Sequence, residues 1–310
     1  MGPPQGPSAR CAIMVDKFSA LPFDLAHQIL SPLPLADFAR LSCLSKGVRA
    51  FHLSNPIVKF TGFPSESIRT DNRRLDLLNC LDRFFILCGN NQIQSFSLHW
   101  LCNYHVGEVE FVSRFGDEKS QIIGWLQNAV SCNVESLTIF FRALMLHDCT
   151  LPMDLCLPFP CCVFDYEPLR SLIVDMRCTV LKASSFATSH VSNLVCMTLT
   201  NVTFEDDKGF CKWVSICCRF LKELLIDHVN GLVNITIESL SLESFSWISG
   251  SSCRTLQLTC PNLKRLKWVG YSLPIYLFMG EFNCLEEVEI SFNNPEVDYA
   301  MSLEGIKNVS

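Results

Sequence analysis

The sequence predicts an α/β protein in which a short helical module precedes a solenoid built on a parallel sheet. After a leader, the chain carries apolar residues at helical spacing, which indicates short amphipathic helices. Most of the remainder repeats a strand-like segment at short intervals, as stacked-repeat proteins do. The 310 residues are 49% hydrophobic and only 18% charged. This composition supplies a sizeable core and gives no reason to expect disorder.

Residues 18–60 form the predicted helical module. A helix beginning near Asp24 ends before Pro32 and Pro34, because proline lacks an N–H donor and restricts the residue before it. Leu35 begins a second helical segment with further apolar residues at helical spacing. A unit of about 40 residues buries too little apolar surface to be stable alone. Its leucines therefore pack within this chain or form a surface for another protein.

This segment resembles the F-box, by which adaptors dock on the Skp-type linker of Skp–cullin–F-box ubiquitin ligases. The resemblance assigns linker binding to a set of mostly apolar residues, which are Leu21, Pro22, Leu25, Ile29, Leu30, Leu33, Pro34, Leu35, Leu41, Leu44, Ser45 and Lys46. Asp24, Asp37 and Arg49 also match the F-box pattern. Val48 departs from it, because the family usually has tryptophan there. Together with Gly47, which weakens a helix by roughly 1 kcal/mol relative to alanine, this departure predicts reduced linker affinity.

The rest of the chain divides into a leader, a hinge and a solenoid. We expect a flexible leader over residues 1–17 and a polar hinge with turn signals over residues 61–72. The solenoid is predicted over residues 73–310. Its helices are expected at residues 73–87, 121–130 and 206–219, where apolar residues recur at helical spacing.

Eight segments of L-x-x-L-x-L type follow the hinge, and the last four recur every 21 or 22 residues. They begin at Ile93, Val134, Leu169, Leu194, Leu221, Leu242, Leu263 and Leu285. A period of about 20–29 residues around this pattern is typical of a leucine-rich-repeat solenoid, whose repeats bury their leucines only against stacked neighbours. A second set of short strands is expected near residues 232–237, 254–258 and 275–277. Module and repeats together resemble the plant-type F-box/leucine-rich-repeat family.

The C-terminal residues predict an incomplete solenoid. Residues 301–309 resemble the helical side of another repeat, and no polar cap follows them. We therefore expect a shortened chain.

Strand alternation predicts three columns of outward side chains on the concave face of the solenoid. The columns are Glu223, Ser244, Arg265 and Glu287; Leu225, Ser246, Lys267 and Glu289; and Asp227, Ile248, Val269 and Ser291. Strand spacing of about 4.8 Å would place Arg265 beside Glu287 and Lys267 beside Glu289. The candidate substrate-binding residues are Glu223, Leu225, Asp227, Arg265, Lys267, Glu287 and Glu289. The alternative is a set of lateral ion pairs, each worth about 0–1 kcal/mol.

Composition argues against several other classes of protein. A net charge of −6 and a pI near 5.7 do not suit a nucleic-acid partner. No apolar run reaches the roughly 18–20 residues that span a bilayer. The 18 cysteines follow no secretory signal and lack paired zinc-ligand spacing, so we expect reduced thiols in the cytosol or nucleus, without a metal. The seven histidines match no ligand motif, and we expect no cofactor.

The resemblance implies a non-catalytic adaptor. Its module would bind the Skp-type linker, and through it a cullin, while its repeats hold an unknown target protein. Two alternatives remain open: a leucine-rich-repeat receptor for a small molecule, and a degenerate member without a target. A basic concave pocket would favour an anionic ligand, and only Arg265 and Lys267 offer such charge.

Overall fold

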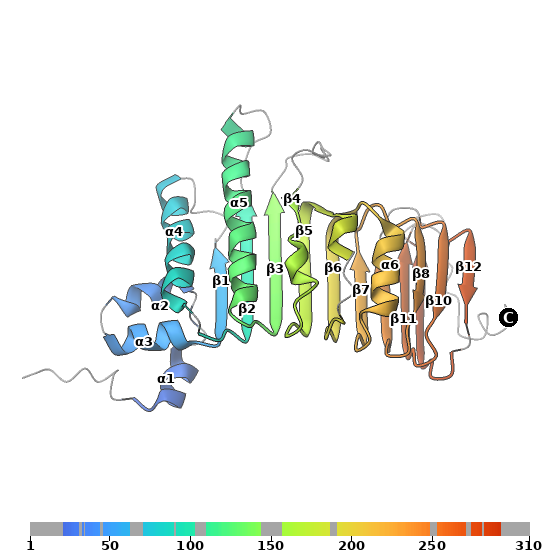
Figure 1. Ribbon diagram of the computed structural model, residues 1–310, viewed down its shortest axis with the longest axis horizontal. Coiled ribbons are helices and arrows are strands. Elements are labelled where there is room, and N and C mark those ends of the chain that lie inside the picture. The colour runs from blue at the N-terminus through green and yellow to red at the C-terminus, as the bar shows by residue number, and fades with distance from the viewer. Residues whose placement is uncertain are drawn as a thin grey trace, which may run out of the picture.

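The computed structural model shows an elongated stack of strands with a helical module at its N-terminal end (Figure 1). It describes residues 21–30, 33, 35–43, 46–62, 71–89, 91–102, 110–143, 157–186, 191–248, 253–270, 274–280 and 282–292. The leader and residues 301–309 therefore lie outside the described residues. The predicted architecture of a helical module followed by a parallel-sheet solenoid is confirmed.

Three short helices form the module. They are α1 (Phe23–Leu30), α2 (Leu35–Ser42) and α3 (Lys46–Ser54). The break between α1 and α2 falls where Pro32 and Pro34 predict it. The sequence did not predict the next element, strand β1 (Ile57–Gly62), which spans the expected boundary between module and hinge at residue 61. Its short apolar run lacks the L-x-x-L-x-L pattern that marks the other strands.

A large parallel sheet runs the length of the molecule, in the order β1-β2-β3-β5-β6-β7-β9-β11-β13. All eight predicted repeat segments are strands of this sheet. They are β2 (Ser95–Cys102), β3 (Ser136–Ala143), β5 (Ser171–Leu181), β6 (Cys196–Phe204), β7 (Glu223–Asp227), β9 (Ser244–Ile248), β11 (Arg265–Gly270) and β13 (Glu287–Phe292). The two-residue strand β4 (Leu157–Pro158) pairs with β5.

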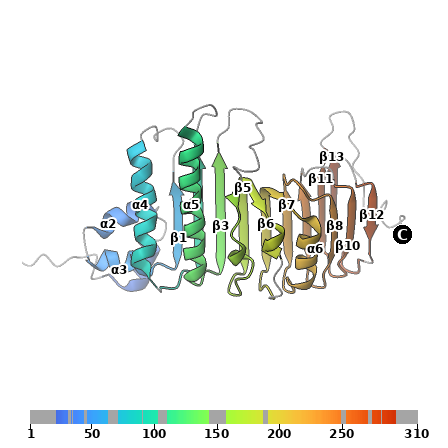
Figure 2. The same ribbon diagram turned by 45° about the horizontal axis from the view of Figure 1, so that its top comes forward.

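The return path of each repeat packs on one face of the large sheet (Figure 2). Early repeats return through long helices, α4 (Asp71–Cys88) and α5 (Glu110–Ser131), and the repeat between β6 and β7 returns through α6 (Asp207–Ile216). The last repeats return through a second parallel sheet of β8 (Asn234–Glu238), β10 (Thr255–Thr259) and β12 (Tyr276–Met279). These strands are the predicted second set. Repeats of 21 or 22 residues leave room for a strand, whereas the longer ones accommodate a helix.

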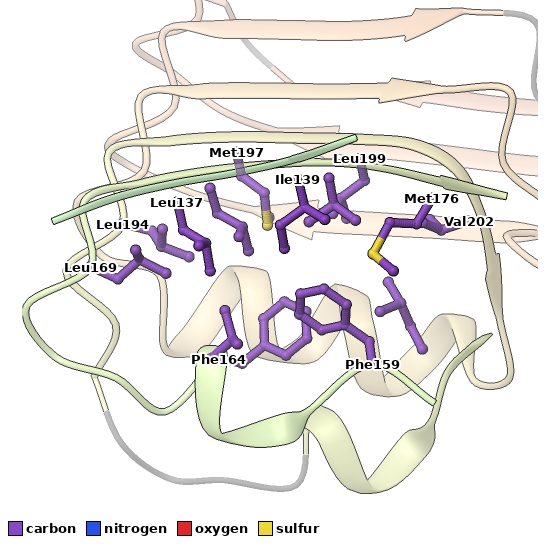
Figure 3. Packing of buried hydrophobic residues seen from close by; sticks show 14 of the residues in the cluster. Leu137, Ile139, Phe159, Phe164, Leu169, Met176, Leu194, Met197, Leu199 and Val202 are labelled. Carbon is purple, nitrogen blue, oxygen red and sulfur yellow. The ribbon is translucent and has the colours of Figure 1, made fainter. Parts of the chain in front are cut away.

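The core is a layer between the large sheet and these return elements. Figure 3 shows Leu137 and Ile139 of β3 and Met197 and Leu199 of β6 on the same side of the sheet, facing Phe164. Strand β5 lies between β3 and β6. Each strand contributes alternate residues to this layer, since successive side chains point to opposite faces. The core is therefore continuous along the stack, and each repeat is stabilised by its neighbours.

The outward residues form the predicted columns. Glu223 pairs in register with Ser244, Ser244 with Arg265, and Arg265 with Glu287. The other two columns follow the same register. We call the surface carrying the three columns the open sheet face.

Candidate functional site

The exposed side of α1 carries two large apolar residues. Leu25 and Ile29 are 47% and 54% exposed, and lie four residues apart on one side of the helix. Ala26 and Leu30, on the other side, are buried. A helix of eight residues is too short to be stable without packing, so the buried side holds α1 in place. The exposed side remains available to another molecule.

A small apolar cluster holds the three helices together. Leu30 and Val48 are its buried members, and Leu33, Leu41 and Phe51 pack around them. Val48 therefore faces the interior of the module. Its replacement of the family's tryptophan changes internal packing and does not directly remove contact area from the exposed side of α1.

Contacts with the solenoid fix the module in position. The His52 ring meets the Phe84 ring of α4 edge-on, with 5.4 Å between centroids. The Asn91 side-chain amide donates a hydrogen bond to the Leu53 carbonyl oxygen at 2.9 Å, near the end of α3. Leu35 belongs to the solenoid core. The docked surface therefore comes from α2 and α3, and α1 projects beyond it (Figure 1).

The structure separates the predicted linker-binding residues into groups. Pro22, Leu25, Ile29 and Lys46 are exposed, and Leu21, Leu33 and Leu41 are half-buried. Leu30 and Leu35 are buried, and Pro34, Leu44 and Ser45 lie outside the described residues. Leu30 and Leu35 therefore pack within this chain, whereas linker binding by the exposed residues stays a prediction.

Burial of His52 affects its protonation. The side chain is 5% exposed, and desolvation lowers its pKa from 6.5 to about 4. His52 is therefore neutral at physiological pH and packs as an aromatic residue between module and solenoid.

The predicted charges on the open sheet face form ion pairs. Lys267 bonds to Glu289 of the adjacent strand at 2.6 Å, as expected. Arg265 pairs with Glu223 at 3.4 Å, two strands away, although Glu287 is its register neighbour. Ser244 lies between Arg265 and Glu223, and its small side chain leaves room for the guanidinium to reach across. These exposed pairs are worth at most about 1 kcal/mol each.

Leu225 and Asp227 of the same face are half-buried, and Asp227 contacts the His228 ring at 2.5 Å. Glu287 and Glu289 are exposed at the end of the sheet. The ion pairs at Arg265 and Lys267 fit the alternative of lateral ion pairs. Substrate binding by these residues therefore stays a prediction.

A second row of charges was not recognised in the sequence. Lys222, Glu243 and Lys264 each immediately precede a strand, and the stack brings them side by side. Lys264 and Lys222 donate to the Glu243 carboxylate at 2.7 and 3.0 Å. These bonds lower the Glu243 pKa to about 2. Each of these residues stands one position before its strand, and this shared position was the sequence signal that could have predicted the row.

The described cysteines are free thiols. Burial raises the pKa of Cys88, Cys211 and Cys260 to about 11, so these thiols stay protonated at neutral pH. Among the described residues, no three cysteine, histidine or acidic side chains gather as a metal site. No helix in the described ranges is long and apolar enough to cross a membrane.

Comparison with known proteins agrees with the sequence resemblance. The F-box domain model matches residues 18–51. The F-box/LRR-repeat protein At3g58900 of Arabidopsis thaliana is 25% identical across 81% of this chain and 78% of that protein. The F-box/LRR-repeat protein At4g14103 of the same plant is 23% identical across 82% of this chain and 61% of that protein. No solved structure matches the chain.

Proposed function

We propose, from the F-box domain at residues 18–51 and the F-box/LRR-repeat homologues that match most of the chain, that this protein is a substrate adaptor. It would serve a ubiquitin ligase of the Skp–cullin–F-box type. An F-box domain implies binding of a Skp-type linker, and the repeats would hold a target protein. The free thiols suit the reducing cytosol or nucleus, where we place this activity.

The exposed pair Leu25 and Ile29 is the observation that carries the proposal. Fully burying a leucine or isoleucine is worth about 1.5–3 kcal/mol, so covering the exposed half of each gains about 1 kcal/mol. Removing both apolar side chains, Leu25 and Ile29, would therefore weaken docking to the linker by about 2 kcal/mol, or roughly 30-fold in affinity.

The mechanism that follows is positioning. The module would bind the linker, and the linker would join the cullin that brings the ubiquitin-conjugating enzyme. A target held on the repeats would then present its lysines at high effective concentration. The chemistry belongs to the partners, and this chain supplies geometry.

Co-purification with a Skp-type linker tests the proposal. Leu25→Ser with Ile29→Ser should strongly reduce recovery of the linker, because removing the exposed apolar surface weakens docking by roughly 30-fold. Ile86→Ser with Leu87→Ser is the matched control, since these α4 residues are similarly exposed and should not affect docking. Thermal unfolding confirms that both variants fold. Equal recovery of linker by all three proteins would refute docking through α1.

A small-molecule receptor remains the second candidate from the sequence. The only two basic residues proposed for its pocket, Arg265 and Lys267, are each paired with a glutamate, which reduces their attraction for an anion. Thermal-shift screening with small metabolites tests this alternative, and reproducible stabilisation would support it.

A further inference from the structure

A cluster of basic side chains lies at the edge of the large sheet where its strands begin, the lower edge in Figure 1. Backbone hydrogen bonds connect the residues along this edge. The Lys222 amide donates to the Val195 carbonyl oxygen at 2.8 Å, the Glu243 amide to that of Lys222 at 2.9 Å, and the Lys264 amide to that of Glu243 at 2.8 Å. Arg170 lies in the same row, one residue before β5. The positions before β5, β7, β9 and β11 therefore carry charged side chains on one edge, and the apolar Val195 occupies the position before β6.

The charges of this edge do not cancel. Glu243 neutralises one positive charge while it binds both Lys222 and Lys264, and its low pKa keeps it ionised. Arg170 and Arg219 form no ion pair within the described part of the chain. Glu135 and Glu286 continue the row at its two ends. Between these two carboxylates, four basic side chains and Glu243 line one hollow, so this stretch has excess positive charge on a chain whose net charge is −6.

Two adjoining hollows lie at these residues. The first has a volume of about 400 Å³ and is lined by Arg170, Arg219, Phe220, Lys222, Leu240 and Lys264 among others. We call these six residues the basic edge groove. The second hollow, of about 840 Å³, shares Arg219 and Leu240 with it. Phe220 and Leu240 are 54% and 77% exposed, so apolar surface lies in the same hollow as the guanidinium groups of Arg170 and Arg219.

We propose that the basic edge groove binds an acidic peptide segment that carries an apolar side chain. Arginine suits carboxylates because its planar donors can bond both oxygens. Exposed Phe220 and Leu240 would cover the apolar side chain and exclude water around it. An acidic segment is repelled by the acidic remainder of the chain, so charge directs it to this groove.

The inference rests on the proposed function in one respect, since the segment would belong to the target protein. Binding itself requires only this chain. A peptide-binding assay without linker therefore separates failure of the groove from failure of α1 docking.

The probe is a fluorescein-labelled synthetic peptide of aspartate and glutamate residues around one central phenylalanine. Its binding to the full chain is followed by fluorescence anisotropy. Arg170→Glu with Arg219→Glu should weaken binding at least tenfold, because attraction becomes repulsion. Lys182→Glu with Arg254→Glu makes the same charge change at exposed residues outside the groove and should retain most of the affinity. Equal weakening by both pairs would overturn the groove as the site.

Companion measurements test each part of the proposal. Phe220→Ser with Leu240→Ser should also weaken binding at least tenfold, and it keeps the test informative if the charge reversal prevents folding. Replacing the peptide's phenylalanine by serine should give the same loss, and affinity should fall as salt rises. No detectable binding would overturn the proposal. Equally tight binding of a single-stranded oligonucleotide of the same charge would overturn the assignment to a peptide.

Discussion

His52 couples the attachment of the helical module to pH. Its ring is buried against Phe84, and burial lowers its pKa from 6.5 to about 4. Between these values the unfolded chain binds a proton that the folded chain does not accept. The His52 contribution to stability is therefore complete above about pH 6.5 and decreases as pH falls towards 4. Replacing His52 by leucine should remove this dependence.

The magnitude follows from the two pKa values. At pH 5 the unfolded histidine is mostly protonated and the folded one mostly neutral. This difference destabilises the folded state by about 2 kcal/mol, compared with about 0.2 kcal/mol at pH 7. When the pH is lowered from 7 to 5, the native chain should therefore lose about 2 kcal/mol of unfolding free energy relative to the His52→Leu variant.

Urea unfolding at pH 7 and pH 5, followed by tryptophan fluorescence, measures this shift. Carboxylates that titrate in the same range affect both proteins and cancel in the comparison. Val48→Ala is the control, because it weakens packing in the same module but retains the histidine. If the gap between native chain and His52→Leu is the same at both pH values, the reasoning from burial is wrong.

Three further predictions concern the solenoid. Gly231→Ala should destabilise the fold by more than about 1 kcal/mol, because φ is +84° and the added Cβ would lie 2.0 Å from a carbonyl oxygen of β6; an unchanged urea midpoint would contradict this. Asp82→Ala should lower the free energy of unfolding by about 1–3 kcal/mol, because the buried Trp125 indole N–H donates to the Asp82 carboxylate at 2.6 Å and would lose this acceptor. The urea midpoint measures this loss. Lys264→Ala should raise the Glu243 pKa above about 2, because that bond is the largest cause of its lowering; carbon NMR titration would show no shift if the bond does not form in solution.

The repeat strands were predictable because their signal is local and repeated. Each L-x-x-L-x-L segment places its leucines inward by alternation, and equal spacing fixes the register of neighbours. The column from Glu223 to Glu287 follows from this geometry alone. β1 was not predicted because it has no such pattern, and it becomes a strand by pairing with β2.

The candidate site was only partly predictable. Helical spacing shows that α1 has two sides, but it does not show which side meets a neighbour. Tertiary packing buries Leu30 against Val48 and leaves Leu25 and Ile29 exposed. The pairing of Arg265 was also undetermined, because a long side chain can pass the adjacent strand where Ser244 is small.

The sequence by itself determined the order of the parts, the strands of the repeats and the identity of the F-box segment, because these depend on spacing along the chain. Only the tertiary structure decided which leucines remain outside and which charges meet. Arg170 and Arg219 are far apart from Lys264 in sequence, and stacking brings all three to one hollow. Spacing along the chain predicts the order and register of the strands, but which side chains meet at this hollow depends on how the repeats stack in space.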